Sequence, residues 1–347
     1  MIAMRVKSAT ALKPSRQITR RLAGVALLSA AMVSLLLAVP GLQGVATQIA
    51  HLHSGWVVAA VAFELGSCIG FVVIFRLFFD ELPAGAAREV AWTEEASGAL
   101  LPGGGVGALA IGGMLMRRAG VSTRRIVERS SALFFLTSAV NVAALVGAGT
   151  LVAVGVASGP DDLLRAGIPI LGGLGATAIV LAVPHVARRR PHRRQPGWLL
   201  DLCTGIDVAR IALSRPSWRL LGAVGYLAFD IAALGATFAA TGRPIPVATL
   251  VLGYLIGYLA NLIPVPGGFG VLEGGLAGTL IAYGAPAGQA AAAVIVYHAV
   301  AFWMPSLGGL IGYALLRRRL DDDRPVRVPH RYTQPPVLAH EAANARA

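Results

Sequence analysis

The feature that most constrains the fold is an apolar segment, residues 254–275, that is interrupted at its centre. It reads YLIGYLANLIPVPGGFGVLEGG, with Pro264, Pro266 and several glycines at the break. In hydrocarbon, an unpaired backbone N–H or C=O group costs several kcal/mol, so the break must be sheltered by protein or line a cavity. The apolar arms, 249–263 and 269–283, have about 15 residues each, fewer than the roughly 20 that a spanning helix needs. The segment therefore predicts two half-helices that meet at a tip.

Composition places the chain in a membrane. Its 347 residues are 56% hydrophobic and 14% charged, and the mean hydropathy is +0.68, too apolar for a soluble domain of this length. A net charge of +13 raises nucleic-acid binding as an alternative. The basic residues lie in clusters between apolar segments, however, which is a topology signal, so we expect no nucleic-acid partner. Cys68 and Cys203 have no metal-ligand spacing, and no metal, cofactor or disulfide is expected.

Long apolar segments predict six transmembrane helices. They cover residues 22–39, 55–79, 130–157, 168–187, 220–240 and 287–316. A signal peptide is the alternative for the first, but its apolar stretch is long and further spans follow. Residues 1–21 form a basic tail, and we expect the polar tail 317–347 to be disordered.

A second broken segment, residues 90–116, contains the sequence LPGGGVG at 101–107. Charged residues flank it on both sides, so we expect it to enter and leave the membrane on one side. The order of two spans, a re-entrant hairpin and a span then occurs twice, over 22–157 and 168–316, with the second copy inverted. Paired broken helices in inverted repeats are typical of transporters with a site near the midplane. The alternative is that Gly and Pro are simply frequent in membrane helices.

The basic residues orient the chain. If both hairpins return to the side that they enter from, all Lys and Arg residues except Arg165 and Arg243 lie on one side. The excess of Lys and Arg in cytoplasmic loops then predicts a multi-pass protein of the cytoplasmic membrane with both termini in the cytoplasm. In the basic loop 188–219, apolar residues at helical spacing from Trp198 to Leu213 predict an amphipathic helix in the headgroup region. A solvated linker is the alternative.

Three motifs carry a family resemblance: LPGGGVGALAIGGMLMRRAG, NLIPVPGGFGVLEGGL and AAAVIVYHAVAFWMPSLGGLIGYALLRRR. They resemble the flippase-like membrane family that includes the transmembrane region of lysylphosphatidylglycerol synthetases. The resemblance covers nearly the whole chain and implies a role in moving or handling lipids or lipid-linked molecules. No synthetase domain is expected after Leu316, so aminoacyl transfer is not implied.

The chain departs from the family's pattern twice. The family's first hairpin usually continues P-G-x-x-G-E, whereas Ala108 follows Gly107 here, and the usual Arg of the last span is replaced by His298. Glu94 and Glu95, earlier in the first hairpin, are candidates to compensate for the missing Glu. Any mechanism that needs the usual Glu and Arg pair is in doubt.

Glu273 is the foremost candidate for a site. It lies one turn inside a half-helix whose positive end favours a carboxylate or a phosphate. Because a phosphate would repel an ionised Glu273, either Glu273 is protonated or a cation such as His298 pairs with it. The alternatives are a helix cap for Glu273 and a packed, hydrogen-bonded side chain for His298. The candidate substrate-binding residues are Glu273, His298, Asn261, Gly267, Gly268, Gly270, Tyr258, Glu94, Glu95, Gly103 and Gly104.

Other polar and small residues within the spans have two interpretations. Tyr254, Tyr258 and Asn261 share a helix face and either line a cavity or bond a neighbour. Glu64 and Asp230 occupy similar places in the two repeats, and pairing with Arg76 or a hydroxyl is the simpler interpretation. Glycines at four-residue spacing favour close helix packing, namely Gly270, Gly274 and Gly278, Gly253 and Gly257, and Gly308 and Gly312.

The leading hypothesis is a lipid translocase, not an enzyme, with membrane lipids as partners and anionic phospholipid headgroups favoured by the arginines. A proton-coupled carrier of small anions and a non-transporting scaffold are the alternatives. A homo-oligomer or a separate lipid-modifying enzyme are further possible partners. We expect the two Pro-Gly tips, near 102–107 and 266–270, to approach each other near the membrane midplane, because neither short arm reaches across.

Overall fold

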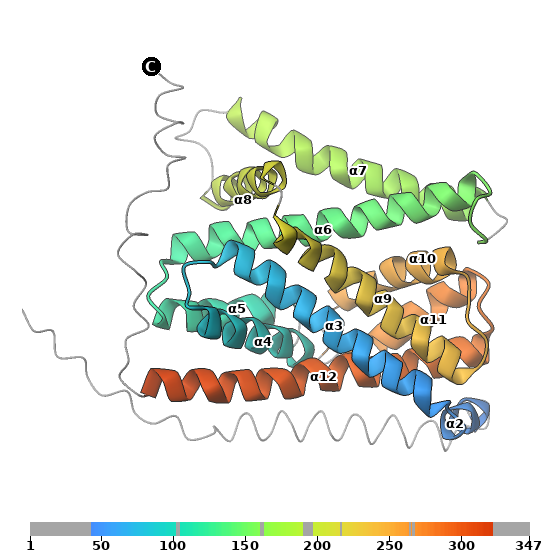
Figure 1. The fold of residues 1–347 in the computed structure, drawn as a ribbon. Coiled ribbons are helices and arrows are strands. Elements are labelled where there is room, and N and C mark those ends of the chain that lie inside the picture. The colour runs from blue at the N-terminus through green and yellow to red at the C-terminus, as the bar shows by residue number, and fades with distance from the viewer. Residues whose placement is uncertain are drawn as a thin grey trace, which may run out of the picture.

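The structure is a computed structural model that describes residues 43–101, 105–159, 163–189, 197–215, 217–263, 265 and 268–321. Every regular element in these ranges is a helix (Figure 1). The expected first span, 22–39, lies outside the described residues, as do the tail 1–21 and residues 322–347. An all-helical fold was expected, because apolar segments of this kind satisfy their backbone hydrogen bonds within each helix.

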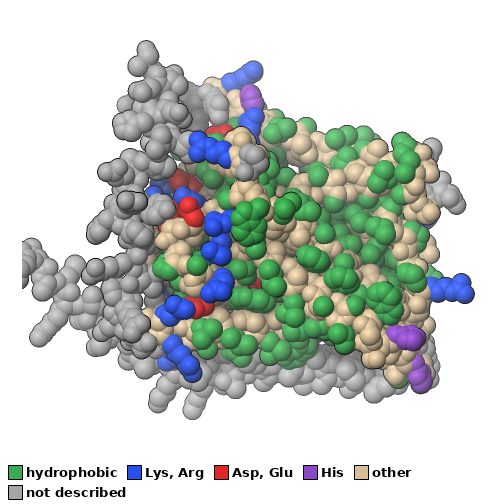
Figure 2. Space-filling model, in the orientation of Figure 1, with side chains coloured by type: hydrophobic (Ala, Val, Ile, Leu, Met, Phe, Trp, Pro, Cys, Tyr) green, Lys and Arg blue, Asp and Glu red, His purple; other side chains and the backbone are tan. Residues whose placement is uncertain are grey.

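Five described helices are long and apolar enough to cross a membrane. They are α3 (Ser54–Phe78), α6 (Thr123–Ala153), α7 (Leu163–Arg188), α9 (Leu221–Thr241) and α12 (Ala287–Asp321). Each coincides with a predicted span, although α6 and α7 begin before, and α12 ends after, the apolar limits read from sequence. Hydrophobic side chains cover the flank of the molecule between its two ends (Figure 2). Such a surface suits hydrocarbon and not water.

Two pairs of shorter helices follow the two broken segments. The first pair is α4 (Ala84–Leu100) and α5 (Gly105–Arg118), and the second is α10 (Val247–Gly257), extended by a 3-10 turn (Tyr258–Leu262), and α11 (Val271–Ala282). Within each pair the two helices pack against each other. The first pair lies in the half of the molecule where α12 ends, and the second pair lies in the opposite half (Figure 1).

Two further α-helices of the described residues are neither long nor paired. Helix α2 (Gln43–Ala50) occupies part of the segment before His51, for which the sequence predicted only a loop. Helix α8 (Gly197–Ser214) occupies the part of the loop 188–219 in which an amphipathic helix was expected. Figure 1 shows α8 nearly end-on, so it crosses the direction of α6 and α7.

Helices α3 and α9 run in opposite directions and pack against each other (Figure 1). A Cβ atom on Gly222 would lie 2.7 Å from the backbone oxygen of Gly70, and one on Gly70 would lie 2.6 Å from the backbone nitrogen of Tyr226. Two glycines therefore let the backbones touch, as small residues do between membrane helices. The crossing fixes how the side chains further along both helices face each other.

The packing role expected for the spaced glycines is confirmed for two of the three sets. Gly257 faces the backbone of α11 at Leu276, and Gly308 faces the ring of Trp92, so neither position has room for a side chain. For Gly270, Gly274 and Gly278 no such packing is found among the described residues, because added Cβ atoms there meet nothing within 4 Å in that part of the chain. The close face of α11 is instead at Gly275, where a Cβ atom would lie 2.6 Å from the Gly257 oxygen.

Candidate functional site

A cavity of about 410 Å³ lies between the long helices and the two short pairs. Leu101 and Gly105, which flank the first break, and Val265 and Gly268, at the second, line this same cavity. The remaining tip residues, 102–104, 264, 266 and 267, lie outside the described residues. The two broken segments, about 160 residues apart in sequence, thus contribute to one site.

Four carboxyl side chains line the cavity: Glu64 on α3, Glu94 and Glu95 on α4, and Asp230 on α9. Glu64 and Glu94 are only 5% and 4% exposed. One oxygen atom, Oε2, of each of the three glutamates is buried and has no hydrogen-bond partner among the described residues. Unpartnered carboxyl oxygens are costly inside a protein, and acids kept within membrane segments are functional candidates by default.

Asp230 is held by two tyrosines. The Tyr297 hydroxyl donates a hydrogen bond to Oδ1 at 2.6 Å, and the Tyr254 hydroxyl donates to Oδ2. The hydroxyl partners expected for Asp230 are therefore present. Glu64 lines the same cavity as Asp230, and the two carboxyls lie within range of each other's charge. Pairing with Arg76 was the wrong expectation for Glu64, since Arg76 lies about three turns further along α3.

Glu273 makes both of the contacts that were considered for it. Its Oε2 accepts a hydrogen bond from the Gly270 N–H at 2.6 Å, so it caps its own half-helix. Its Oε1 lies 2.7 Å from Nδ1 of His298 on α12, whose side chain is 6% exposed. The ring of His298 also packs beside Phe269, with ring centroids 5.1 Å apart. The cap and the pair with histidine coexist.

The structure places most of the candidate site residues around the cavity. His298, Asn261, Tyr258, Gly268, Glu94 and Glu95 line it. Glu273 and Gly270 are not among the lining residues, and they reach the cavity through His298. Gly103, Gly104 and Gly267 lie outside the described residues.

Several lining residues were not chosen from the sequence. Glu64, Asp230, Tyr226, Tyr297 and Ser130 all face the cavity. Glu64 and Asp230 could have been chosen from the sequence, since an acid inside an apolar span is unusual. Nothing in the sequence distinguishes the tyrosines and Ser130, because such residues are common in membrane helices.

The rim of the cavity reaches the apolar flank of the molecule. Leu109 on α5 and Phe134 on α6 line the cavity and are 43% and 61% exposed. In a bilayer, exposed apolar side chains on spanning helices contact lipid tails. The site therefore combines a carboxyl-rich interior with an apolar rim, and no Arg or Lys is present among its described lining residues.

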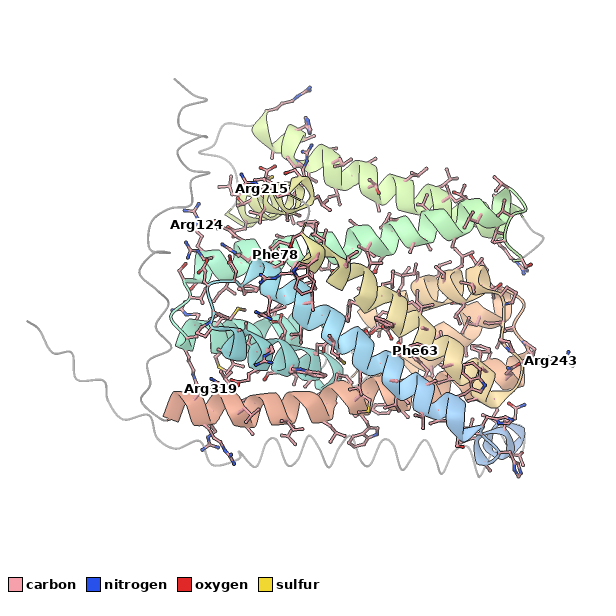
Figure 3. All side chains as sticks on the ribbon, in the orientation of Figure 1. Phe63, Phe78, Arg124, Arg215, Arg243 and Arg319 are labelled. Atoms are coloured by element: carbon pink, nitrogen blue, oxygen red, sulfur yellow. The ribbon has the colours of Figure 1, made fainter. Side chains whose placement is uncertain are left out.

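The two ends of the molecule differ in charge. Arg124, Arg215 and Arg319 lie at one end and Arg243 lies at the other (Figure 3). At the arginine-rich end, Arg125 lies 2.7 Å from Glu81, and Arg319 lies 2.7 Å from Glu89. Both glutamates are buried. These ion pairs tie α6 and α12 to the segment around the start of α4.

Comparison with known proteins identifies the family of the chain. The model of the family described as the lysylphosphatidylglycerol synthase TM region matches residues 21–309. A search of curated proteins found no match. The matched range contains every described helix except the end of α12. Together with the five long apolar helices, it shows a multi-pass membrane protein.

Proposed function

We propose that this chain, which belongs to the family of the lysylphosphatidylglycerol synthase transmembrane region, binds phospholipids in the cytoplasmic membrane and moves them between leaflets. The observation that carries this proposal is the cavity, whose interior is polar while Leu109 and Phe134 form an exposed apolar rim. A headgroup inside such a site is shielded from hydrocarbon while the acyl chains stay in the bilayer. No chemical change of the lipid is part of the proposal.

The topology that supports translocation is an inverted repeat of six spans and two re-entrant hairpins. Helix α4 has 17 residues and α11 has 12, about 26 Å and 18 Å at 1.5 Å per residue, against roughly 30 Å of hydrocarbon. The proposed topology assigns its sixth span to residues 22–39, which lie outside the described residues. The opposite directions of α3 and α9, one from each repeat, agree with the inversion. The arginine-rich end and both termini then face the cytoplasm.

The charge of the cavity favours one class of headgroup. Four carboxyl side chains line it, and His298 is the one basic side chain among its described residues. This lining suits a headgroup that carries an ammonium group, zwitterionic or cationic, because opposite charges within a desolvated site attract strongly. The cytoplasmic arginines add about 1 kcal/mol each of attraction for anionic lipids near the surface. These arginines attract anionic lipids to the surface but do not select which headgroup enters the cavity. A small free anion would not be attracted by the carboxyl lining.

A liposome assay tests the proposal. The protein is reconstituted into liposomes with a trace of phosphatidylethanolamine, phosphatidylcholine or phosphatidylglycerol that carries a fluorescent label on its acyl chain. Dithionite added outside quenches the label in the outer leaflet, so further loss of fluorescence reports transfer from the inner leaflet. We expect transfer several-fold faster than in empty liposomes, with the ammonium-bearing lipids ahead. Equal rates with and without protein for every headgroup would refute translocation.

Two variants on one helix distinguish blocking of the cavity from a general effect of a large side chain on the fold. Ala301 lines the cavity, whereas Ala299, two residues earlier on α12, is exposed on the outer flank. Ala301→Trp fills the site and should abolish transfer, and Ala299→Trp should leave it unchanged. If the protein is instead a scaffold, truncation after Asp321 removes its function in cells and Ala301→Trp does not.

A further inference from the structure

Two carboxyl groups line the same cavity from neighbouring helices. Glu64 projects from α3 and Asp230 from α9, helices that pack against each other, and each carboxyl lies within range of the other's charge. Both side chains are more than nine-tenths buried. Two ionised carboxylates at this separation repel each other strongly in a medium of low dielectric, so such a pair holds at least one proton or is neutralised by a bound cation.

The two members of the pair are not equivalent. Asp230 accepts hydrogen bonds from Tyr254 and Tyr297, which fix its position and stabilise its negative charge. Glu64 has no such support, and its Oε2 is buried without a partner among the described residues while lining the cavity. The shared proton therefore belongs on Glu64, the member that a ligand in the cavity can reach.

The surroundings of the pair offer no fixed cation. The titratable groups that face it are Cys68 on α3, Glu94 and Glu95 on α4, Tyr226 on α9, Tyr254 and Tyr258 on α10 and its 3-10 turn, and Tyr297 on α12. His298, on the wall of the same cavity, is paired with Glu273. No Arg or Lys side chain lines the cavity among the described residues. Nor do these residues contain a cluster of His, Cys, Asp or Glu arranged to hold a metal ion.

From this geometry we infer that Glu64 and Asp230 form a proton-binding site and that the proton exchanges with the ammonium group of a lipid. The inference rests on the proposed translocation. When an ammonium headgroup enters, one proton leaves Glu64, and the pair then neutralises the ammonium. After the lipid leaves on the other side of the membrane, Glu64 takes up one proton there. The empty site then carries this proton back to the first side. Each cycle thus moves one lipid one way and one proton the other way.

The test imposes a proton gradient on the same liposomes, with the membrane potential held at zero by valinomycin and equal potassium. Acyl-labelled phosphatidylethanolamine should accumulate in the leaflet that faces the more acidic side, and reversing the gradient should reverse the accumulation. One-for-one exchange sets a limit of about tenfold accumulation per pH unit, since tenfold in concentration is 1.4 kcal/mol. A pH-sensitive dye inside the liposomes should report proton movement that depends on this lipid.

Glu64→Gln and Asp230→Asn keep the shape of the pair; the first removes the exchangeable proton, and the second removes the negative charge that the pair needs to neutralise the ammonium. Each variant should abolish the response to the gradient. Glu128→Gln alters a carboxyl outside the cavity, one that pairs with Arg124 at the surface, and should keep the full response. As a second measurement, the infrared carbonyl band of a protonated carboxyl should be present in the wild type and weakened in Glu64→Gln.

The outcomes separate the two proposals. Lipid transfer that is equally fast in both directions under either gradient, without proton movement, would overturn the coupling and leave translocation standing. Absence of transfer under every gradient would overturn translocation and the coupling with it. An infrared carboxyl band unchanged in Glu64→Gln would overturn the assignment of the proton to this residue, even if a variant folds too poorly for transport assays.

Discussion

The Nδ1 atom of His298 lies 2.7 Å from Oε1 of Glu273, and this contact joins α12 to the start of α11. The second oxygen of Glu273 caps α11 through the N–H of Gly270. One carboxyl therefore secures the helix that follows the second break and positions a histidine on the cavity wall. The histidine at this place in the last span thus contacts the carboxyl directly.

Removing the histidine should destabilise the protein. His298→Ala leaves a largely buried carboxyl without its partner, which costs about 1–3 kcal/mol, and it should lower the midpoint of thermal unfolding in detergent. Adding Glu273→Gln to that variant should recover part of the loss, because the amide carries no charge and still accepts the Gly270 N–H. A double-mutant cycle measures the coupling. Losses that simply add would show that the contact contributes nothing.

Gly268 should be essential for the shape of the second break. Its φ of +67° lies in the left-handed region that β-branched side chains avoid, and strain of this kind costs on the order of 1–3 kcal/mol. An added Cβ atom would also lie 3.3 Å from the Asn261 side chain. We expect Gly268→Val to impair lipid transfer more than it lowers the amount of folded protein. Gly278→Val is the matched control, since no described residue lies within 4 Å of a Cβ atom added at Gly278. Equal transfer by both variants would argue against the prediction.

The crossing of α3 and α9 should tolerate no side chain at Gly222. Because an added Cβ atom would lie 2.7 Å from the Gly70 oxygen, Gly222→Ala should destabilise the fold by about 1–3 kcal/mol, as overpacking does. Gly225→Ala, one turn further along α9, should be neutral or slightly stabilising. The Cβ atom there would lie 3.7 Å from Phe229, an ordinary contact. Thermal unfolding of the two variants checks the prediction, which fails if their midpoints agree.

Two ion pairs at the arginine-rich end should contribute very differently. Arg319 pairs with the buried Glu89, whose side chain is 8% exposed, whereas Arg124, itself 84% exposed, pairs with Glu128 at the surface. Arg319→Gln leaves a buried carboxylate unpaired and should cost about 1–3 kcal/mol. Arg124→Gln should cost well under 1 kcal/mol, as exposed pairs do. Denaturation of both variants in the same detergent gives the comparison, and equal costs would contradict it.

The sequence by itself determined the spanning helices and the two broken segments. The length of an apolar segment determines whether it can cross the hydrocarbon layer as a helix. The Pro and Gly residues at 264–270 interrupt the backbone hydrogen bonds of a helix whatever surrounds the segment. The contact of Glu273 with its own helix end was also predictable, because it is local in sequence. The sequence also marked Glu64 and Asp230 as candidate functional residues, because acids are rare inside apolar spans.

Only the tertiary structure decided what those acids face. Glu64 and Asp230 are 166 residues apart, and they meet because Gly70 and Gly222 allow α3 and α9 to touch. Sequence periodicity gives the face of a helix on which a residue lies, but not the neighbour that packs there. The same limit applies to Gly270, Gly274 and Gly278: spacing marked a small-residue face, whereas the packing among the described residues brings Gly275 against Gly257. Which helices approach is set by the sum of all side-chain contacts, and no single segment contains that information.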